Sequence, residues 1–505
     1  MGVLNKLSIM RNFGGPALTT GLSDELIQDF AASDQTLVDA INTAAEVFAG
    51  LQNDEAELLA MSEIDQIRTI QAGYVNFYAD DTINPYVAIA ANGPWMISIK
   101  GAVLHDNGGY GMLGFGHTPK NVIAAMSKPQ VMANIMTANL SQKRFIDALL
   151  KEIGHSRGGS PFAKFLCMNS GSEAVTVAAR IADINAKLMT DPQGPKACRK
   201  IRKLGLSGAF HGRTDRPAQF SDSSRAGYIK HLASFRDNDS LITVEPNNIQ
   251  QLEQVFEWAE SNDVFIEAFF MEPVMGEGNP GIAITTEFYA RARELTRAHN
   301  CLFLVDSIQA GIRTHGVLSI VDYPGFEHLD APDMETYSKA LNGGQYPFSV
   351  LAMTAETAAL YRKGVYGNTM TSNPRALDVA CAVLESITPE LRNNIRDRGA
   401  EFMQKFAQLK TEMGGKITKI QGTGLLLSVE LDGAIYKGYG SGSSEEYMRK
   451  QGVNVIHGGE NSIRFTPHFY ISSKEVDLIL AATRDAILNG PQKVQSASVN
   501  SSAAA

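Results

Sequence analysis

Short apolar runs that alternate with helical patterns constrain the fold of this chain more than any other feature. The clearest runs are 165–168, 265–271 and 301–305, and polar or turn residues bound each of them. A helical pattern covers 173–189, and residues 291–298 end another directly before the third run. Apolar strands joined by helical crossovers form a mostly parallel sheet with helices on both faces. The sequence therefore predicts an α/β fold.

Outside this region the pattern changes twice. Residues 20–68 predict short amphipathic helices, and a polar helix is predicted over 389–413. The last part mixes strands at 424–431 and 462–465 with a closing helix from residue 474, which predicts a smaller α+β domain. A chain of 505 residues is long enough for about three such units.

The charge of the chain is uneven. The net charge is −9, from 45 Lys and Arg against 54 Asp and Glu. Residues 12–67 contain no Lys or Arg and eleven acids, so they carry −11 and leave +2 for the rest. An acidic chain without a basic block lacks the features of a nucleic-acid-binding protein. No apolar run reaches the ~18 residues needed to span a membrane, so we expect no membrane association through such a span.

The cysteines and histidines favour a reducing compartment and no metal site. The four cysteines, Cys167, Cys198, Cys301 and Cys381, form no CxxC pair and are expected to be free thiols. The N-terminal residues lack a secretory signal, so we expect a cytoplasmic protein, with a mitochondrial one as the alternative. The ten histidines show no metal-ligand spacing. A GxGxxG match at 109–114 is rejected as a dinucleotide site, because Pro119 interrupts the required helix.

A possible phosphate-binding loop follows the first apolar run. In Met168-Asn-Ser-Gly-Ser-Glu-Ala174, between a strand and a helix, the amides of Gly171 and Ser172 would be free at the helix start. Free amides and the helix dipole suit a phosphate there. An ordinary serine cap with a glycine turn is an equally good explanation.

Two further residues suit cofactor chemistry. Asp306 ends the run 301–305, where an ionised carboxylate is costly unless it meets a cation such as a protonated pyridine nitrogen. Lys339 follows a short predicted strand and precedes a glycine pair. Desolvation would favour its neutral amine and a Schiff base. A turn aspartate and a solvated surface lysine are the alternatives.

These three segments, in this order, resemble those of the class III (ω-amino-acid type) aminotransferases, which depend on pyridoxal 5'-phosphate (PLP). The resemblance covers about 94–489 and points to the ornithine aminotransferase-like branch, through Val321-Asp-Tyr323 and Gly344-Gln-Tyr-Pro347. It implies fold type I, with a large domain whose mostly parallel sheet is sandwiched by helices and a smaller α+β C-terminal domain.

The expected division of the chain follows from the resemblance. An acidic helical extension covers 1–82, and a large cofactor-binding domain covers 83–387, with a start that could pack with the small domain. The small C-terminal domain covers 388–490, and a disordered tail covers 491–505. We hypothesise that the acidic helices pack around a dimer or cover its surface, away from the chemistry.

The resemblance also implies roles for the cofactor residues. Lys339 would bind PLP as a Schiff base and then move a proton between two carbon centres. Asp306 would pair with the pyridine nitrogen, Ile308 would lie under the ring, and Gln309 would lie near the phenolic oxygen.

Four more matches complete the expected PLP site. Gly171 and Ser172 would give the phosphate-binding amides, and Phe210 would stack on the ring. Thr369 would reach the phosphate of the neighbouring subunit, so the resemblance implies a homodimer with shared active sites.

The resemblance assigns four residues to substrate binding. Arg213 with Tyr110 would hold the distant carboxylate of the amino donor. Arg464 would hold the carboxylate of a 2-oxo acid, and Glu272 would mask it in the other half-reaction. A planar guanidinium suits bidentate carboxylate binding, although a structural ion pair is the alternative for each residue.

The implied reaction moves the terminal amine of an ω-amino or diamino acid (ornithine-, lysine- or 4-aminobutyrate-like) to a 2-oxo acid such as 2-oxoglutarate, in ping-pong order. An amino-acid racemase, an aminomutase or a decarboxylative enzyme of the same fold is the alternative, and a non-catalytic homologue is a third. Three features depart from the family pattern: Met275 replaces a usual Gln, Ser307 replaces a usual Glu, and Gly311-Ile-Arg-Thr-His-Gly316 replaces a usual Gly-Phe-Gly-Arg-Thr-Gly.

Overall fold

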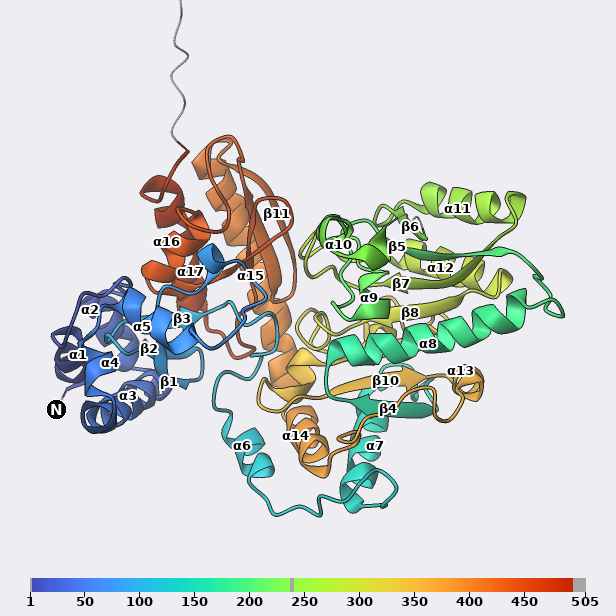
Figure 1. Ribbon diagram of the computed structural model, residues 1–505. Helices are drawn as coiled ribbons and strands as arrows, with labels where there is room; N and C mark the ends of the chain where they lie inside the picture. The colour runs from blue at the N-terminus through green and yellow to red at the C-terminus, as the bar shows by residue number, and fades with distance from the viewer. Residues whose placement is uncertain (1, 237–239, 494–505) are drawn as a thin grey trace, which may run out of the picture.

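Three β-sheets organise the structure, a computed structural model that describes residues 2–236 and 240–493. In Figure 1 the N-terminal helices and the C-terminal helices lie on the left, and the seven-stranded sheet lies on the right. The short 3-10 helices are η1 (Asp80–Thr82), η2 (Ala233–Phe235), η3 (Ile320–Asp322) and η4 (Lys339–Asn342).

The seven-stranded sheet has the order β4-β10-β9-β8-β7-β5-β6. Strands β6, β5, β7, β8 and β9 pair in parallel, whereas β10 runs antiparallel to both of its neighbours. Its strands are β4 (Lys164–Met168), β5 (Lys200–Leu206), β6 (Leu241–Val244), β7 (Val264–Met271), β8 (Leu302–Asp306), β9 (Met334–Tyr337) and β10 (Ser349–Met353).

Helices cover both faces of this sheet because successive strand residues point to opposite sides. On one face Phe270 packs in the core that α8 covers. On the other face Phe269 packs in the core that includes residues of α11 and α12. The helices of this part are α6 (Lys120–Met126), α7 (Leu140–Glu152), α8 (Gly171–Thr190), α9 (Asp215–Ala218), α10 (Arg225–His231), α11 (Ile249–Ser261), α12 (Thr286–Ala298), α13 (Ala355–Leu360) and α14 (Pro374–Glu385).

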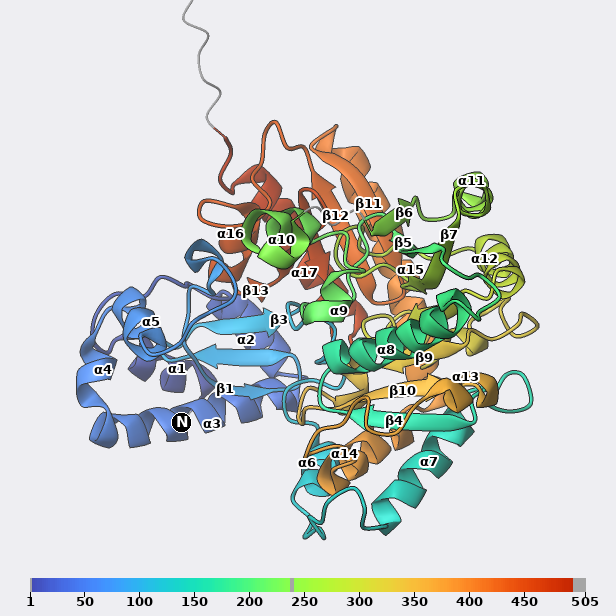
Figure 2. The same cartoon turned by 45° about the vertical axis from the view of Figure 1, so that its right-hand side comes forward.

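The N-terminal helices pack against a small sheet of the order β1-β2-β3-β13. Helix α3 lies against β1 and β2 of this sheet (Figure 2). Strand β13 pairs with β3, so residues 453–454 join the start of the chain to its C-terminal part. The elements are α1 (Val3–Arg11), α2 (Asp24–Ala31), α3 (Gln35–Asp54), α4 (Ala56–Ala60), α5 (Glu63–Gln71), β1 (Ala88–Asn92), β2 (Trp95–Ser98), β3 (Val103–Asp106) and β13 (Val453–Asn454).

Buried polar contacts fix the N-terminal helices to this sheet. The amine of Lys100 donates to the carbonyl oxygens of Met61 at 2.8 Å, Leu59 at 3.2 Å and Phe13 at 3.4 Å. The indole of Trp95 donates to Asp34 at 2.6 Å. The acidic helices are therefore an integral layer of the same chain.

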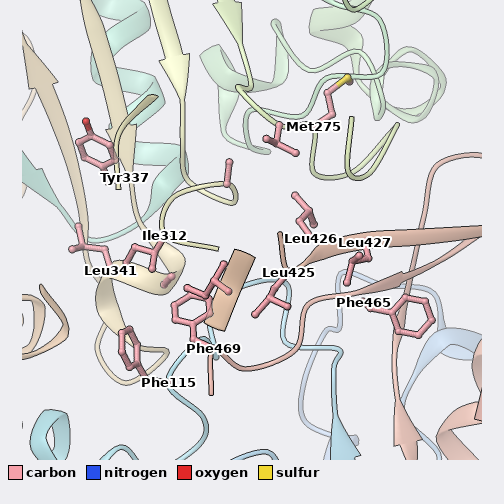
Figure 3. Close-up of a cluster of buried hydrophobic side chains, with 14 of the residues drawn as sticks. Phe115, Met275, Ile312, Tyr337, Leu341, Leu425, Leu426, Leu427, Phe465 and Phe469 are labelled. Carbon is pink, nitrogen blue, oxygen red and sulfur yellow. The ribbon is translucent and has the colours of Figure 1, made fainter. Parts of the chain in front are cut away.

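The C-terminal part is a four-stranded antiparallel sheet of the order β11-β12-β15-β14, covered by helices. Figure 3 shows the apolar junction with the large sheet region, where Phe115, Ile312 and Leu341 lie near Leu425 and Phe469. The elements are β11 (Ile417–Thr423), β12 (Leu426–Leu431), β14 (Ile456–Gly458), β15 (Ser462–Phe465), α15 (Pro389–Met413), α16 (Ser444–Lys450) and α17 (Ser473–Leu488).

The predicted fold class is confirmed: the large sheet is mostly parallel, with helices on both faces, and a smaller α+β part follows it. The division at residues 82, 387 and 490 stays a prediction. The predicted disordered tail lies outside the described residues apart from 491–493. In the described part of the chain, no helix combines the length and apolar character needed to cross a membrane.

Candidate active site

A cavity of about 190 Å³ opens at the carboxyl ends of the strands of the large sheet. Loops after β4, β5, β7, β8 and β9 converge there, which is the usual ligand site of an open α/β sheet. Eight of the residues predicted from the sequence line it: Gly171, Ser172, Phe210, Glu272, Asp306, Ile308, Gln309 and Lys339. The other four, Tyr110, Arg213, Arg464 and Thr369, lie outside its lining.

Asp306 presents a buried carboxylate to the cavity from the end of β8. Oδ1 accepts hydrogen bonds from the Thr336 hydroxyl at 3.0 Å and the Ile308 amide at 3.2 Å. Oδ2 lies 2.8 Å from Nδ1 of His211. These three groups fix the orientation of the carboxylate, which suits a cationic ring nitrogen in the cavity.

Lys339 begins η4, with one residue between it and the end of β9, and lies in the left-handed backbone region with φ 44°. Its Nζ donates to Oε1 of Gln309 at 3.3 Å. Burial, and then the positive charge of Arg464, lower the pKa of Lys339 to about 8. About a tenth of the amine is therefore neutral and nucleophilic at pH 7, far more than for an ordinary lysine.

The N-terminus of α8 forms another wall of the cavity. Ser170 caps the helix and exchanges hydrogen bonds with Glu173 in a capping box, in which the Ser170 hydroxyl accepts a hydrogen bond from the amide of Glu173. The amides of Gly171 and Ser172 precede that bond in the first turn, where the helix dipole favours an anion. A Cβ on Gly212 would overlap the Ser172 side chain, so only glycine allows this close approach.

Two side chains suit a planar ring. Phe210 and Ile308 both line the cavity, from the loops after β5 and β8. A Cβ at Gly171 would lie 2.8 Å from Cδ1 of Ile308, so this side chain lies against the start of α8. An aromatic ring and an aliphatic side chain are suitable packing surfaces for a flat cofactor.

Arg464, on β15, is almost fully buried beside the cavity. Its guanidinium carbon lies 5.5 Å from the ring centroid of Tyr110, and its NH1 donates to the carbonyl oxygen of Gly276. Glu272 accepts from the amide of the same Gly276 at 2.9 Å and from the amide of Phe210 at 3.0 Å. Burial raises the pKa of Glu272 to about 7. Glu272 and Arg464 therefore both bind the main chain of Gly276, Glu272 at the amide and Arg464 at the carbonyl oxygen.

Arg213 is less enclosed. Its guanidinium carbon lies 5.2 Å from the ring centroid of Phe210 and 5.6 Å from that of Phe77, and 3.8 Å separates its NH2 from Oε1 of Glu277. The side chain of Arg213 remains 42% exposed. It thus lies at the cavity edge, on the outer side of Phe210.

Thr369 is exposed, in the loop between α13 and α14. The preceding residue, Asn368, bonds with Asn169 at 3.2 Å and with Glu173 at 3.2 Å. This loop therefore docks on the first turn of α8, without Thr369 lining the cavity.

Several polar residues of the site escaped the sequence interpretation. His211 and Thr336 hold Asp306, and the guanidinium of the fully buried Arg313 donates to the carbonyl oxygens of Gly111, Leu425 and Pro467. The adjacency of His211 to Phe210 was a usable signal. Nothing in the pattern distinguished Thr336 or Arg313 from core positions.

Two of the departures from the family pattern, Met275 and Ser307, occupy buried positions. Met275 is fully buried and packs in the large core. The hydroxyl of Ser307 donates to Oε1 of Glu335 on β9 at 2.5 Å, and burial raises the pKa of Glu335 to about 7. A carboxyl group therefore lies beside residue 307, supplied by the adjacent strand.

The residues present fit PLP. Asp306 offers a buried carboxylate for a protonated ring nitrogen, the start of α8 offers amides for a phosphate, and Lys339 offers an amine of lowered pKa. The Nε2 atom of His211 and the Nε2 atom of Gln309 are buried and have no hydrogen-bond partner within residues 2–236 and 240–493, so two polar atoms at the cavity wall are free to bind a ligand.

Comparisons with known proteins agree with this geometry. The sequence profile of the aminotransferase class-III family matches residues 77–487. Ornithine aminotransferase 2 of Staphylococcus saprophyticus is 29% identical over 405 residues, which covers 79% of this chain and 93% of that protein.

Two solved structures share the fold. The ornithine aminotransferase of Toxoplasma gondii superposes with a TM-score of 0.72 at 23% identity, over 87% of this chain and 98% of that one, and a second structure of that enzyme has PLP at partial occupancy in its active site. The acetylornithine aminotransferase of Elizabethkingia anophelis gives 0.67 at 24% identity, over 84% and 99%. The family match covers most of the sequence, and we conclude that this chain belongs to the class-III aminotransferases and is a PLP-dependent enzyme.

Proposed function

We propose that this aminotransferase moves the terminal amine of an ω-amino or diamino acid to a 2-oxo acid such as 2-oxoglutarate, in ping-pong order. The observation that carries the proposal is the convergence of Lys339, Asp306 and the start of α8 on one cavity, with two arginines at its edge. One amine-handling group and two separate carboxylate-binding cations match a reaction between two carboxylate substrates.

Each residue of the cavity has a proposed task. Lys339 attaches the cofactor through Nζ and afterwards carries a proton between the two reacting carbons. Asp306 holds the proton on the pyridine nitrogen, while His211 and Thr336 keep its carboxylate in place. PLP, when bound, supplies an electron-accepting ring that stabilises negative charge at the reacting carbon.

The two arginines divide the substrates in this proposal. Arg213 and Tyr110 bind the distant carboxylate of the donor, which leaves its terminal amine at the cofactor. Arg464 binds the carboxylate of the 2-oxo acid. Glu272, which meets Arg464 through Gly276, weakens that site in the donor half-reaction. Relatives named for ornithine and acetylornithine support a donor of this length.

A donor panel tests the function. Purified enzyme receives ornithine, lysine, 4-aminobutyrate or N-acetylornithine without acceptor, and the cofactor absorbance is followed. We expect at least one donor to abolish the visible band and 2-oxoglutarate to restore it with formation of glutamate. Borohydride should fix the cofactor to Lys339, and Lys339→Ala should lose both this fixation and turnover.

The alternative outcome is also specific. Racemisation of an amino acid without any 2-oxo acid, with the visible band retained, would replace transamination by a racemase. The relatives named above are aminotransferases, which gives no support to a racemase or an aminomutase.

We also propose a homodimer in which Thr369 reaches the partner's cofactor phosphate. An exposed apolar segment before α7 supports it: Val131, Ile135 and Met136 are 69%, 46% and 86% exposed. Met136→Asp should give a monomer, measured by light scattering, and this monomer should have low activity. The control is Leu188→Asp, on the exposed surface of α8, which should remain a dimer with unchanged activity. A fully active monomer would contradict the shared site.

The proposed location is the cytoplasm. All four cysteines are free, and three of them are buried. Free thiols suit a reducing compartment. Fractionation of the native cells checks it, and recovery in a mitochondrial fraction would favour the alternative.

A further inference from the structure

The segment that links the acidic helices to β1 lies over the predicted donor site. After α5 ends at Gln71, residues 74–78 run across exposed surface, where Tyr74 is 81% and Phe77 is 72% exposed. Tyr78 stacks on Tyr110, with ring centroids 5.9 Å apart and 12° between the ring planes. The next residue back, Phe77, contacts Arg213. Two consecutive aromatic residues thus contact both residues proposed to bind the donor carboxylate.

Arg213 depends on aromatic contacts for its position. Among the described residues its charged partner is Glu277, at 3.8 Å, which is long for an ion pair, and the side chain is 42% exposed. A solvated ion pair of this kind contributes little order. The rings of Phe210 and Phe77, from distant parts of the chain, lie 5.2 Å and 5.6 Å from its guanidinium carbon. Both distances lie within the range of cation–π attraction.

We propose that Phe77 is a positioning residue that restrains Arg213 and thereby tunes the affinity of the enzyme for the carboxylate of its amino donor. This inference rests on the proposed function. A guanidinium binds aromatic rings through its faces and carboxylates through the N–H groups on its edge. In this proposal the faces of the guanidinium pack against Phe77 and Phe210, which would leave its edge available to the donor.

The role is one of specificity for one half-reaction. Arg464, proposed for the 2-oxo acid, is buried and bonded to the Gly276 carbonyl oxygen, with no ring contact to Phe77 among its contacts in the described chain. Loss of Phe77 should therefore affect the donor and leave the acceptor unchanged. Because the contact is made before and during the reaction, it changes KM and not kcat.

The experiment compares holoenzyme variants. Phe77→Leu keeps an apolar side chain without a ring, and the donor KM should rise about two- to fivefold, as expected for an exposed cation–π contact. The donor kcat, the acceptor KM and the visible absorbance of bound PLP should stay as in the wild type. Phe77→Tyr keeps an aromatic ring, so its donor KM should equal that of the wild type. Tyr74→Leu, in the same exposed segment, should change neither the donor KM nor the acceptor KM.

A binding measurement gives a readout independent of turnover. Pentanoate, a carboxylate without an amine, should compete with the donor, and its dissociation constant should rise by the same factor in Phe77→Leu. An unchanged donor KM, or an equal rise for donor and acceptor, would overturn the role of Phe77.

Arg213→Lys separates this failure from failure of the proposed function. If Arg213→Lys raises the donor KM and Phe77→Leu does not, the donor site stands and the positioning role is refuted. If neither variant changes the donor KM, the donor site itself is wrongly assigned and both proposals fail.

Discussion

The lowered pKa of Lys339 predicts how fast the apoenzyme takes up its cofactor at each pH. With a pKa of about 8, about half of the amine is neutral at pH 8, whereas an ordinary lysine with a pKa of 10.5 is ~0.3% neutral. The nucleophilic fraction is therefore about 160 times larger than for a solvated lysine at that pH. The rate of covalent PLP uptake should rise with pH, with an inflection near pH 8, and should level off above about pH 9.

Arg464 is the charge to perturb. Burial is the first cause of the lowered pKa, and the Arg464 guanidinium is the second, because it disfavours a second cation nearby. Arg464→Met removes that charge, so the pKa of Lys339 should rise and the inflection should move to higher pH. Glu272→Gln removes a neighbouring negative charge that raises this pKa, so it should move the inflection to lower pH.

Stopped-flow absorbance of apoenzyme mixed with PLP, from pH 6 to 10, measures these inflections. Arg464→Lys keeps a positive charge and serves as the control, with an inflection closer to the wild type than that of Arg464→Met. A wild-type inflection near pH 10 would refute the lowered pKa. An unshifted inflection in Arg464→Met would show that burial alone sets it.

Three other predictions follow from buried contacts. Lys100→Met removes an amine that donates to three carbonyl oxygens, so the free energy of local opening of the N-terminal helices should fall by about 3–5 kcal/mol. Hydrogen exchange in α3 measures this loss, and the absorbance band of bound PLP should be retained. A loss below ~1 kcal/mol would contradict the role of these contacts. Burial would raise the pKa of Glu475, but His105 and His468 outweigh it and hold this pKa well below 4.5. The ionised carboxylate therefore stabilises the folded state above pH 4.5, and this stabilisation is lost as the pH falls through the lowered pKa. Glu475→Gln should make the fall of Tm between about pH 5 and pH 3 less steep. Gly212 has φ 118°, and the Cβ of Gly212→Ala would overlap the Ser172 side chain, so PLP should bind about tenfold more weakly. The control is Gly158→Ala, which also has a positive φ but places its Cβ in open space, and it should not change PLP affinity.

Three strands of the large sheet were predictable because each is a local, nearly continuous apolar run, whereas β5 carries three basic residues and was not predicted. The runs at 165–168, 265–271 and 301–305 became β4, β7 and β8, with ends shifted by at most one residue. The helix predicted over 389–413 has the same bounds as α15, since Thr388 caps it and Gly414 ends it in the left-handed conformation. The antiparallel direction of β10 was not predictable, because an apolar run carries no sign of its direction.

The sequence by itself determined where several strands end, so Asp306 and Lys339 were predicted as cofactor residues from their place after an apolar run and after a short strand. Their family resemblance then supplied the reaction, and the class-III match agrees with it. Only the tertiary structure decided which distant residues surround them. Phe77 reaches Arg213 from the end of the acidic helices, and Arg464 reaches Tyr110 across more than 350 positions. Local patterns set turns and strand ends, whereas such contacts arise when whole layers pack, and packing depends on surfaces that no short stretch of sequence contains.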